Sequence, residues 1–224
     1  MPINDYTTFE LVRKNVGGGG LLTAVHKSLK PVSVSNEDEE EILVVEANLG
    51  ESKVRFINGY GPQEKAPEQS RRSFFHQLDL DIKKSKLSGA LLCIEMDSNA
   101  KLGSSIIPGD PKEQTENGKL LAKVITDNDL IVVNATQLCN GVITRHRETI
   151  NGVEESVLDH FIVCKDFFKL VLNMTVDEAG KYSLTKYTNK TGAVRCAKES
   201  DHRTIIVEIK YQWGSSNRNK DERI

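Results

Sequence analysis

The sequence predicts a protein of the α/β or α+β class, and three observations lead to that prediction. Stretches with the alternation of strands and stretches with the period of helices follow one another, and no linker is long enough to separate two domains. Hydrophobic residues make up 38% and charged residues 28% of the 224 residues, which argues against a disordered protein and against a membrane protein. No apolar run approaches the ~18–20 residues of a transmembrane span, so we expect no membrane partner.

The N-terminus and the cysteines indicate an intracellular protein. The first residues, MPINDYTT, show neither a basic start nor an apolar segment, so no secretory signal is visible. The cysteines are widely spaced and form no CxxC pair, which favours reduced thiols over a disulfide framework or a zinc site. We therefore expect the protein in the nucleus or the cytoplasm.

Strand patterns fill the first part of the chain. Residues 20–28 follow four glycines and predict a strand that is entered through a flexible turn. Residues 41–49 and 53–60 are two further strand-like runs on either side of Gly50, so we expect them to form a hairpin. The acidic run 36–41 before them reads as a solvated loop.

The pattern then changes to the period of a helix. Segment 67–89 begins with a proline that suits a first helical turn, repeats large apolar residues at every fourth position and ends in a glycine. A buried strand fits 90–97, and a second amphipathic helix fits 116–128. We expect one domain over residues 1–213 and a polar, frayed tail over 214–224. Four more strand-like runs complete the domain, at 130–135, 156–164, 170–176 and 202–209.

Polar clusters follow the predicted strands at their ends, where a rigid scaffold exposes reactive side chains. Each cluster alone has an ordinary interpretation, since an Asp-x-Asn is usually a turn and a Ser-Asp-His is usually a capping or surface feature. Asp159 is more informative, because a carboxylate inside an apolar strand needs a partner, and the imidazolium of His202 is the obvious candidate. The four clusters are Asn58-Gly59-Tyr60-Gly61-Pro62, Asp97-Ser98-Asn99-Ala100, Ser156-Val157-Leu158-Asp159 and Ser200-Asp201-His202.

The order and spacing of these clusters resemble the endonuclease/exonuclease/phosphatase superfamily, and within it the apurinic-type endonuclease domains of non-LTR retrotransposons. The resemblance spans residues 17–209 and implies a four-layer α/β sandwich, in which two packed mixed β-sheets are flanked by helices. The matching segments in family order are GGGGLLTAV, FINGYGP, Asp97-x-Asn99, ENGKLLAKVITDNDLIVVNA, TRHRETINGVEESVLDHFIV and SDHRTIIV.

The resemblance implies a hydrolase that cleaves phosphodiester bonds, nicks DNA and is derived from a retroelement that also encodes a reverse transcriptase. It implies that His202 hydrogen-bonds the scissile phosphate and that Asp159 orients His202. It assigns to Asp97 the positioning and deprotonation of the attacking water, and to Asn99 the holding of that water and of the phosphate. Mg²⁺, or Mn²⁺ in its place, is the implied cofactor, because a hard cation with carboxylate ligands suits the charge that develops on phosphate oxygens.

The metal side of the implied site is incomplete. Asp201 would serve the metal directly or through water, and Tyr60 would reach toward the phosphate. The family opens with a strand that carries an Asn, a helix, and a strand that ends in a Gln-Glu pair, whose glutamate is a principal metal ligand. Only sixteen residues precede the four glycines, so we expect the chain to lack this segment. Glu10 and Glu46 are no more than guesses for the missing ligand.

Another departure from the family pattern lies directly before Asp97. The family has glycine before the first Asp, whereas this chain has Met96, and Glu95 points to the same strand face as Asp97. Glu95 is either an extra carboxylate near the metal or an outward polar residue, and both interpretations stay open. A missing core strand would also leave a sheet edge open to another chain, so we expect self-association through that edge.

Basic residues gather beside the clusters, although the formal net charge is −2 and any nucleic-acid affinity must come from a local patch. Arg145 and Arg147 precede the strand of Asp159. Five further basic residues lie between residues 181 and 198 with no acid among them. That segment is either a solvated loop or a phosphate-tracking patch, and the second interpretation favours a nucleic acid, DNA above all, as partner. The five residues are Lys181, Lys186, Lys190, Arg195 and Lys198.

Three functions remain open on the sequence. The first is a Mg²⁺-dependent DNA endonuclease, which the presence of all the polar clusters favours. The second is a catalytically impaired remnant that acts as a nucleic-acid-binding module, which the absent glutamate segment favours. The third is another phosphoesterase of the same superfamily, because a fold does not determine its substrate.

Overall fold

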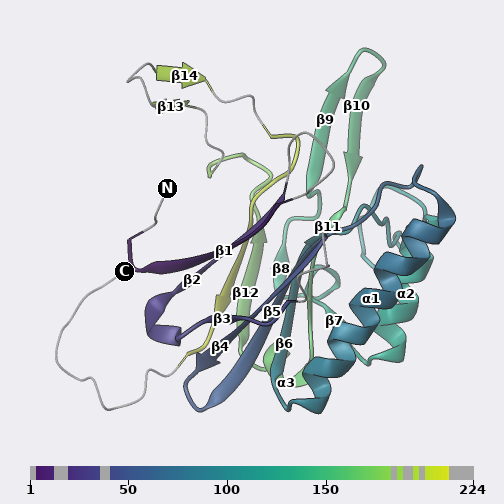
Figure 1. Cartoon of the computed structure of the whole chain (residues 1–224). Coiled ribbons are helices and arrows are strands. Elements are labelled where there is room, and N and C mark those ends of the chain that lie inside the picture. The colour runs from purple at the N-terminus through teal and green to yellow at the C-terminus, as the bar shows by residue number, and fades with distance from the viewer. Residues whose placement is uncertain are drawn as a thin grey trace.

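A six-stranded mixed sheet forms the middle layer of the computed structural model (Figure 1). Its β5 and β6 strands are parallel, and its other neighbours are antiparallel. In spatial order the strands are β3 (Val32–Ser33), β4 (Ile42–Leu49), β5 (Ser52–Tyr60), β6 (Leu91–Asp97), β11 (Asp159–Val163) and β7 (Ile131–Val132). The structure describes residues 4–12, 20–35, 41–182, 186–188, 194–196 and 200–211.

The predicted hairpin is confirmed as β4 and β5. The two strands pair antiparallel from Ile42 opposite Gly59 to Leu49 opposite Ser52. Gly50 turns the chain between them with a φ of 65°, in the left-handed region that favours glycine. The apolar run of β4 is buried on both faces, as is typical of a strand inside a sheet that is covered on both sides.

Two helices cover one face of this sheet and confirm the two predicted helices (Figure 1). Helix α1 (Glu68–Leu87) buries Phe74, Phe75, Leu78 and Ile82, which pack on β5 and β6 in the largest hydrophobic cluster. Helix α2 (Glu116–Asp127) joins the same cluster. At its start the side chain of Thr115 accepts a hydrogen bond from the backbone of Gly118, which caps the helix.

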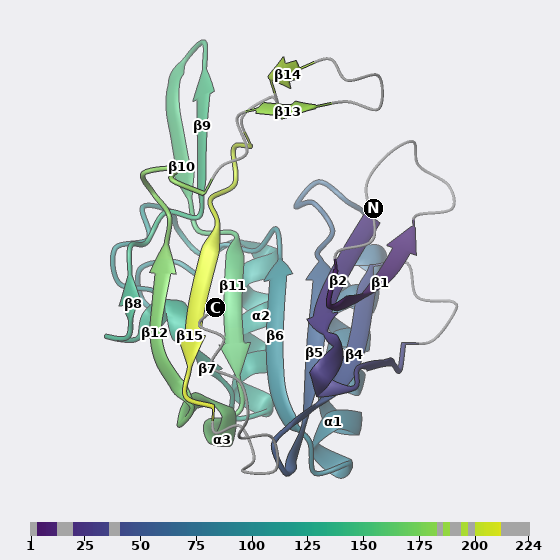
Figure 2. The ribbon, with the colours of Figure 1, turned by 90° about the vertical axis from the view of Figure 1, so that its left-hand side faces the viewer.

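The opposite face carries two smaller sheets (Figure 2). One has the order β15-β12-β8, and the other pairs β1 with β2. Their side chains form separate clusters with residues of the six-stranded sheet, so the prediction of packed mixed sheets is confirmed. Their strands are β15 (Ile205–Ile209), β12 (Val171–Val176), β8 (Cys139–Asn140), β1 (Tyr6–Val12) and β2 (Gly20–His26).

The described part of the chain has the α/β architecture that the resemblance implies, with packed mixed sheets flanked by helices. Both long helices lie on the same side of the middle sheet, and no helix among the described residues covers the outer face of the smaller sheets (Figure 2). The short helix α3 (Lys165–Phe168) lies at one end of the sheets (Figure 2). Its Phe167 is buried in the hydrophobic cluster between them. No described helix combines the length and the apolar character that crossing a membrane requires.

Three predicted strands differ from the structure in their limits. The run 130–135 is a strand only over β7, because the chain then turns into a 3-10 helix over Val133–Ala135. The run 156–164 contains the last residue of one strand and the whole of β11, and Val157 and Leu158 lie between them. The run 202–209 is a strand only from Ile205 onward, so His202 lies before β15 and not within it.

Besides strand β1, a projecting hairpin is an element that sequence patterns did not predict. Strands β9 (Arg145–Thr149) and β10 (Gly152–Ser156) pair antiparallel and extend beyond the ends of the sheets (Figures 1 and 2). Exposed charged residues dominate both strands, so no apolar alternation marks them in the sequence. Strands β13 (Lys186–Thr188) and β14 (Val194–Cys196) form another small antiparallel pair.

Candidate active site

The register of the middle sheet brings two of the predicted site residues together. Asp97 is the last residue of β6, and Asp159 is the first residue of β11. The two residues are direct antiparallel partners, and Tyr60 at the end of β5 is the parallel partner of Asp97. The ends of three inner strands therefore lie side by side at one end of the sheet, although they are far apart in the sequence. The Tyr60 side chain packs against the cluster around Leu21 and Val25, so its reach toward a phosphate stays a prediction.

His202 completes this group from the other layer. Its Nδ1 atom lies 2.9 Å from Oδ2 and 3.1 Å from Oδ1 of Asp159, and its Nε2 atom lies 3.8 Å from Oδ2 of Asp97. Asp97, Asp159 and His202 each offer one atom to a cluster in which all three lie within 4.8 Å of one another. The predicted partnership of Asp159 and His202 is thus present in the structure.

The electrostatics of this group suit proton transfer near neutral pH. Burial, together with the neighbouring carboxylate of Asp159, raises the pKa of Asp97 to about 6. The hydrogen bond to Asp159 raises the pKa of His202. The site therefore combines a carboxylate with an elevated pKa and an imidazole whose charged form is favoured.

A close contact between two loops fixes the position of Asn99. Asn99 has a φ of 46°, its backbone N–H donates to Oδ1 of Asp97 at 3.1 Å, and its side-chain amide donates to the carbonyl of Gly61 at 2.9 Å. The N–H of Gly61 in turn donates to the carbonyl of Asp97 at 2.7 Å. A Cβ atom at Gly61 would lie 2.1 Å from the carbonyl oxygen of Ser98, so the loops can approach this closely only with glycine there.

Three buried polar residues behind the site were not assigned to it from the sequence. Asn117 is fully buried on α2, and its amide donates to the carbonyls of Pro62 at 2.8 Å and of Asn99 at 3.1 Å. Ser98 and His160 are also buried, with Ser98 Oγ and His160 Nδ1 2.9 Å apart. Ser98 and His160 each directly follow one of the two carboxylates, and Asn117 lies in a segment that the resemblance matches. These positions are the only signal that the sequence offers for them.

Asp201 lies beside the group but faces another partner. Its Oδ2 atom accepts a hydrogen bond from Nε of Arg145 at 3.0 Å, and Nη2 of Arg145 lies 2.9 Å from the same oxygen in an ion pair. Partial burial opposes ionisation of Asp201, but the contacts with Arg145 outweigh it and lower the pKa of this carboxyl. The structure thus shows an ion pair at Asp201, and its service to a metal stays a prediction.

The other glutamates considered as metal ligands lie elsewhere. Glu10 is exposed on β1. Glu46 forms ion pairs with Lys53 and Arg55 on neighbouring positions of β5. The hydrogen bond from Lys53, opposed by partial burial and reinforced by Arg55, holds the pKa of Glu46 below its ordinary value. Neither residue belongs to the cluster around Asp97.

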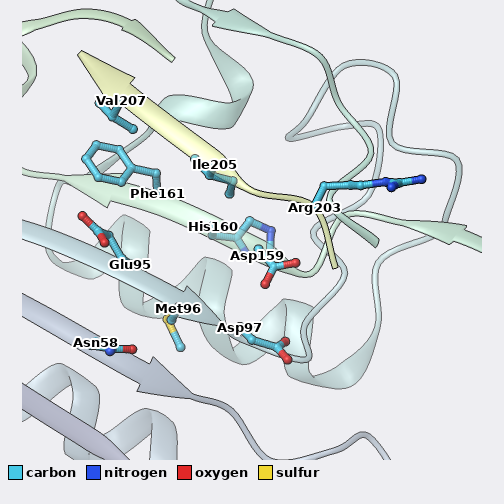
Figure 3. Close-up of a pocket in the computed structure, with 10 residues that line it drawn as sticks. All are labelled: Asn58, Glu95, Met96, Asp97, Asp159, His160, Phe161, Arg203, Ile205 and Val207. Carbon is cyan, nitrogen blue, oxygen red and sulfur yellow. The ribbon is translucent and has the colours of Figure 1, made fainter. Parts of the chain in front are cut away.

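Glu95 lines a pocket of about 320 Å³ that adjoins the two aspartates (Figure 3). The pocket lies between β6 and β11 on one side and β15 on the other, and Phe161, Ile205 and Val207 supply apolar walls. Glu95 and Asp97 both line it, as expected from their alternation on β6. The surrounding protein desolvates the Glu95 carboxyl and so raises its pKa, although the side chain is open to solvent in the pocket.

The predicted nucleic-acid-binding residues are only partly described. Arg147 is exposed on β9, and Lys181 is exposed after β12. Arg145 is half-buried in its pair with Asp201. Lys190 and Lys198 lie outside the described residues, and so do the side chains of Lys186 and Arg195. The basic segment 181–198 as a phosphate-tracking patch therefore stays a prediction.

The carboxylates of the group fit a hard divalent cation. Two carboxylates on paired residues repel each other, and the elevated pKa of Asp97 reflects this repulsion together with burial. A divalent cation bound by carboxylate oxygens would relieve that repulsion. Nδ1 of His202 is already occupied by Asp159, so the oxygens of Asp97 and Asp159 are the donors that suit Mg²⁺ or Mn²⁺.

Comparison with known proteins identifies the fold. No protein-family model and no curated protein sequence matches this chain. Among solved structures, the endonuclease domain of TRAS1, a telomere-specific non-LTR retrotransposon, matches with a TM-score of 0.65 and 18% identity over 94% of this chain and 83% of that one. The 3'-5' exonuclease NExo from Neisseria meningitidis matches with a TM-score of 0.64 and 13% identity, over 93% of this chain and 80% of that one.

A third match carries the name of the superfamily itself. An endonuclease/exonuclease/phosphatase family protein from Bacteroides thetaiotaomicron has a TM-score of 0.58 and 12% identity, over 92% of this chain and 75% of that one. At such identities the likeness concerns the fold. The predicted resemblance to this superfamily, and to the endonuclease domain of a retrotransposon, is thus confirmed at the level of structure.

Proposed function

We propose that this chain, which has the fold of the endonuclease/exonuclease/phosphatase superfamily, is a divalent-metal-dependent endonuclease that nicks DNA and derives from a retroelement. The observation that carries the proposal is the meeting of Asp97, Asp159 and His202 within 4.8 Å. Two carboxylates at the ends of buried strands supply a base and an orienting acceptor, and the imidazole from the segment before β15 supplies a donor. Hydrolysis of a phosphodiester needs these three roles.

In this mechanism Asp97 takes the proton from the attacking water. Its pKa of about 6 lies close to neutral pH, where a carboxylate combines ionisation with useful basicity. A positioned base of this kind contributes ~10²–10⁴ to the rate. Asn99, whose amide nitrogen is bound to Gly61, keeps the adjoining loop in place beside that water.

His202 stabilises the charge that develops on the phosphate. Asp159 accepts a hydrogen bond from the Nδ1–H group of His202. The Nε2–H group, on the side of Asp97, is then available to donate a hydrogen bond to a phosphate oxygen. The raised pKa of His202 keeps the imidazole protonated as that charge grows. A divalent cation would be held beside Asp97 and Asp159, and it would supply Lewis-acid stabilisation of the charge on the phosphate oxygens.

DNA is the proposed substrate, and two observations support it. Arg147 is exposed on the hairpin that begins at Arg145, and Lys181 is exposed after β12, and positive side chains of this kind suit a polyanionic backbone. Among the structural neighbours, a form of the Neisseria protein is bound to a product DNA hairpin. That protein is described both as an exonuclease and as a 3' phosphatase, so removal of a terminal phosphate is the second candidate reaction.

Nicking of supercoiled plasmid DNA tests the proposal. We expect the purified chain to convert supercoiled into open-circular DNA with Mg²⁺, and to stop when a chelator is added or when His202 is replaced in His202→Gln. The control His76→Gln changes an exposed histidine on α1 and should nick like the wild type. Nicking that survives His202→Gln would overturn the assignment of the site.

The same preparation separates the alternatives. DNA binding without nicking at any tested Mg²⁺ or Mn²⁺ concentration would indicate a catalytically impaired binding module. Release of inorganic phosphate from a 3'-phosphorylated oligonucleotide, without plasmid nicking, would indicate the phosphatase.

Self-association forms a further part of the proposal. Within the described residues β15 pairs with β12 along one edge, and no described strand pairs with its other edge. Ile205, Ile206 and Val207 on this edge strand are partly buried, and an open edge of this kind can pair with another chain. Size-exclusion chromatography should show a dimer or larger species at high protein concentration, and a clean monomer there would contradict this part.

A further inference from the structure

The position of His202 needs an explanation, because this residue belongs to no strand. It lies in the segment between Ser200 and the start of β15 at Ile205, and that segment is partly exposed. Yet Nδ1 of His202 lies 2.9 Å from Asp159, which comes from a buried strand of another sheet. Something outside β15 must therefore hold His202 in this place.

The base of the projecting hairpin supplies the backbone part of the answer. Arg145 and His202 form an antiparallel bridge. The N–H of His146 donates to the carbonyl of Asp201 at 2.7 Å, and the N–H of Arg203 donates to the carbonyl of Thr144 at 2.7 Å. Residues 144–146, which we call the crossbar, thus run alongside residues 201–203.

The crossbar also holds the partner of His202. The hydroxyl oxygen of Thr144, which is fully buried, accepts hydrogen bonds from the N–H groups of Leu158 at 2.9 Å and of Asp159 at 3.0 Å. Asp159 and His202 are therefore attached to the same three-residue segment. The hydrogen bond between Asp159 and His202 therefore depends on the contacts that the crossbar makes with each of them.

On the side of His202 the crossbar also forms one ion pair. Arg145 directs both Nε and Nη2 at a single oxygen of Asp201, the residue directly before His202. This two-pronged contact depends on the planar guanidinium, since a lysine offers a single donor atom. The side chains are 20% and 43% exposed, and ion pairs with this exposure contribute little to the stability of a fold.

We propose that Arg145 is a positioning residue, which acts through its ion pair with Asp201 to hold His202 in its hydrogen bond with Asp159. The proposal rests on the proposed function for its catalytic meaning, but its geometric content is independent of turnover. It also gives Asp201 a role in the position of His202. The rival role for Arg145 is direct contact with a phosphate of the substrate.

The experiment uses Arg145→Lys and Asp201→Asn together with the double variant. Arg72→Lys is the matched control, because Arg72 donates from Nε to Glu68 in an ion pair on α1, away from the site. The first readout is the ¹H–¹⁵N signal of the His202 side chain, assigned by its absence in His202→Gln. A proton held between Nδ1 and a carboxylate gives a far-downfield resonance, and this readout needs no activity.

We expect that resonance to broaden or disappear in Arg145→Lys and in Asp201→Asn, and to remain in Arg72→Lys. The double variant should be no worse than either single variant, because each removes the same contact. Melting temperatures should stay within about 3 °C of the wild type, since the pair is partly exposed. If the wild type nicks DNA, kcat should fall about tenfold in both single variants while KM is unchanged.

Contrary results are equally definite. A His202 resonance that is unchanged in both single variants would overturn the proposal, whatever the outcome of the plasmid assay. An unchanged resonance together with a raised KM in Arg145→Lys would assign the residue to phosphate contact. If exchange with water hides the proton in the wild type, crystal structures of the two variants answer the question. The distance between Nδ1 and Asp159 should then exceed its present 2.9 Å, and an unchanged distance contradicts the proposal.

Discussion

The two halves of the candidate site are built differently. The carboxylate half, Asp97 and Asp159, lies at the paired ends of two buried strands, with Ser98 and His160 packed behind it at 0% and 1% exposure. The imidazole half, His202, lies in a partly exposed segment that the crossbar holds by two backbone hydrogen bonds and one ion pair. Substitutions behind the carboxylates should therefore lower the stability of the fold. Substitutions around His202 should instead disturb the geometry of the site and lower the rate of nicking.

Asp97→Asn gives the largest effect and separates rate from stability within the carboxylate half. The rate of nicking should fall ~10²–10⁴-fold, because the proposed base is lost. Burial and Asp159 disfavour the charge on Asp97, so its removal should also stabilise the fold at neutral pH by roughly 1–3 kcal/mol. Plasmid nicking and urea unfolding measure the two quantities. A large loss of stability would show that the carboxylate has a structural role instead.

Gly61→Ala should produce the next largest effect, and it attacks the loops behind the carboxylates. A Cβ atom there would lie 2.1 Å from the carbonyl oxygen of Ser98, so the loops must separate, at a cost of about 1–3 kcal/mol in unfolding free energy. Gly59→Ala is the matched control, because its added Cβ atom meets only side chains at 3.5 Å and beyond. Equal unfolding midpoints for the two variants would contradict the close contact.

His160→Gln tests the buried support through pH. Burial lowers the pKa of His160 to about 4, from an ordinary value of 6.5. The unfolded chain therefore binds a proton that the folded chain refuses between these values. Stability from the neutral imidazole is complete above about pH 6.5 and is lost as the pH falls toward 4. By about pH 5 the wild type should have lost about 2 kcal/mol that the variant does not lose.

Urea unfolding of both proteins at about pH 7.5 and about pH 5 measures this difference. The elevated pKa of Asp97 acts in the opposite direction over part of the same range, but it is common to both proteins and cancels in the comparison. The control His76→Gln, which removes an exposed histidine of α1, should follow the wild type. A gap between wild type and His160→Gln that is independent of pH would mean that His160 is not held in its neutral form.

Arg147→Gln should give the smallest effect and tests the exposed surface of the imidazole side. Loss of one phosphate contact should weaken DNA binding only a few-fold and reduce the slope of log K against log salt by about 1. Binding titrations at several salt concentrations measure that slope. Lys165→Gln on α3, where the lysine pairs with Asp129, is the control and should leave the slope unchanged. Identical slopes for both variants would remove Arg147 from the interface.

Local patterns predicted most of the fold. The period of four in 67–89 and the amphipathic pattern of 116–128 identify helices, because helix contacts join residues a few positions apart. The projecting hairpin was missed, since both of its faces are exposed and no apolar alternation marks its strands. The strand limits near His202 were also misjudged, because the crossbar pairs with that segment from another part of the chain.

The order of residues along the chain establishes which side chains stand at the strand ends of the site. Asp97, Asp159 and His202 were identifiable because each interrupts or borders an apolar run and because the order and spacing of their clusters resemble the endonuclease/exonuclease/phosphatase superfamily. Only the tertiary structure decided which atoms meet. It paired Asp97 with Asp159 through sheet register, turned Asp201 toward Arg145 and placed Asn117 across two loops. These contacts join residues that are 18 to 62 positions apart, and such pairings depend on how strands and loops pack, which no local periodicity records.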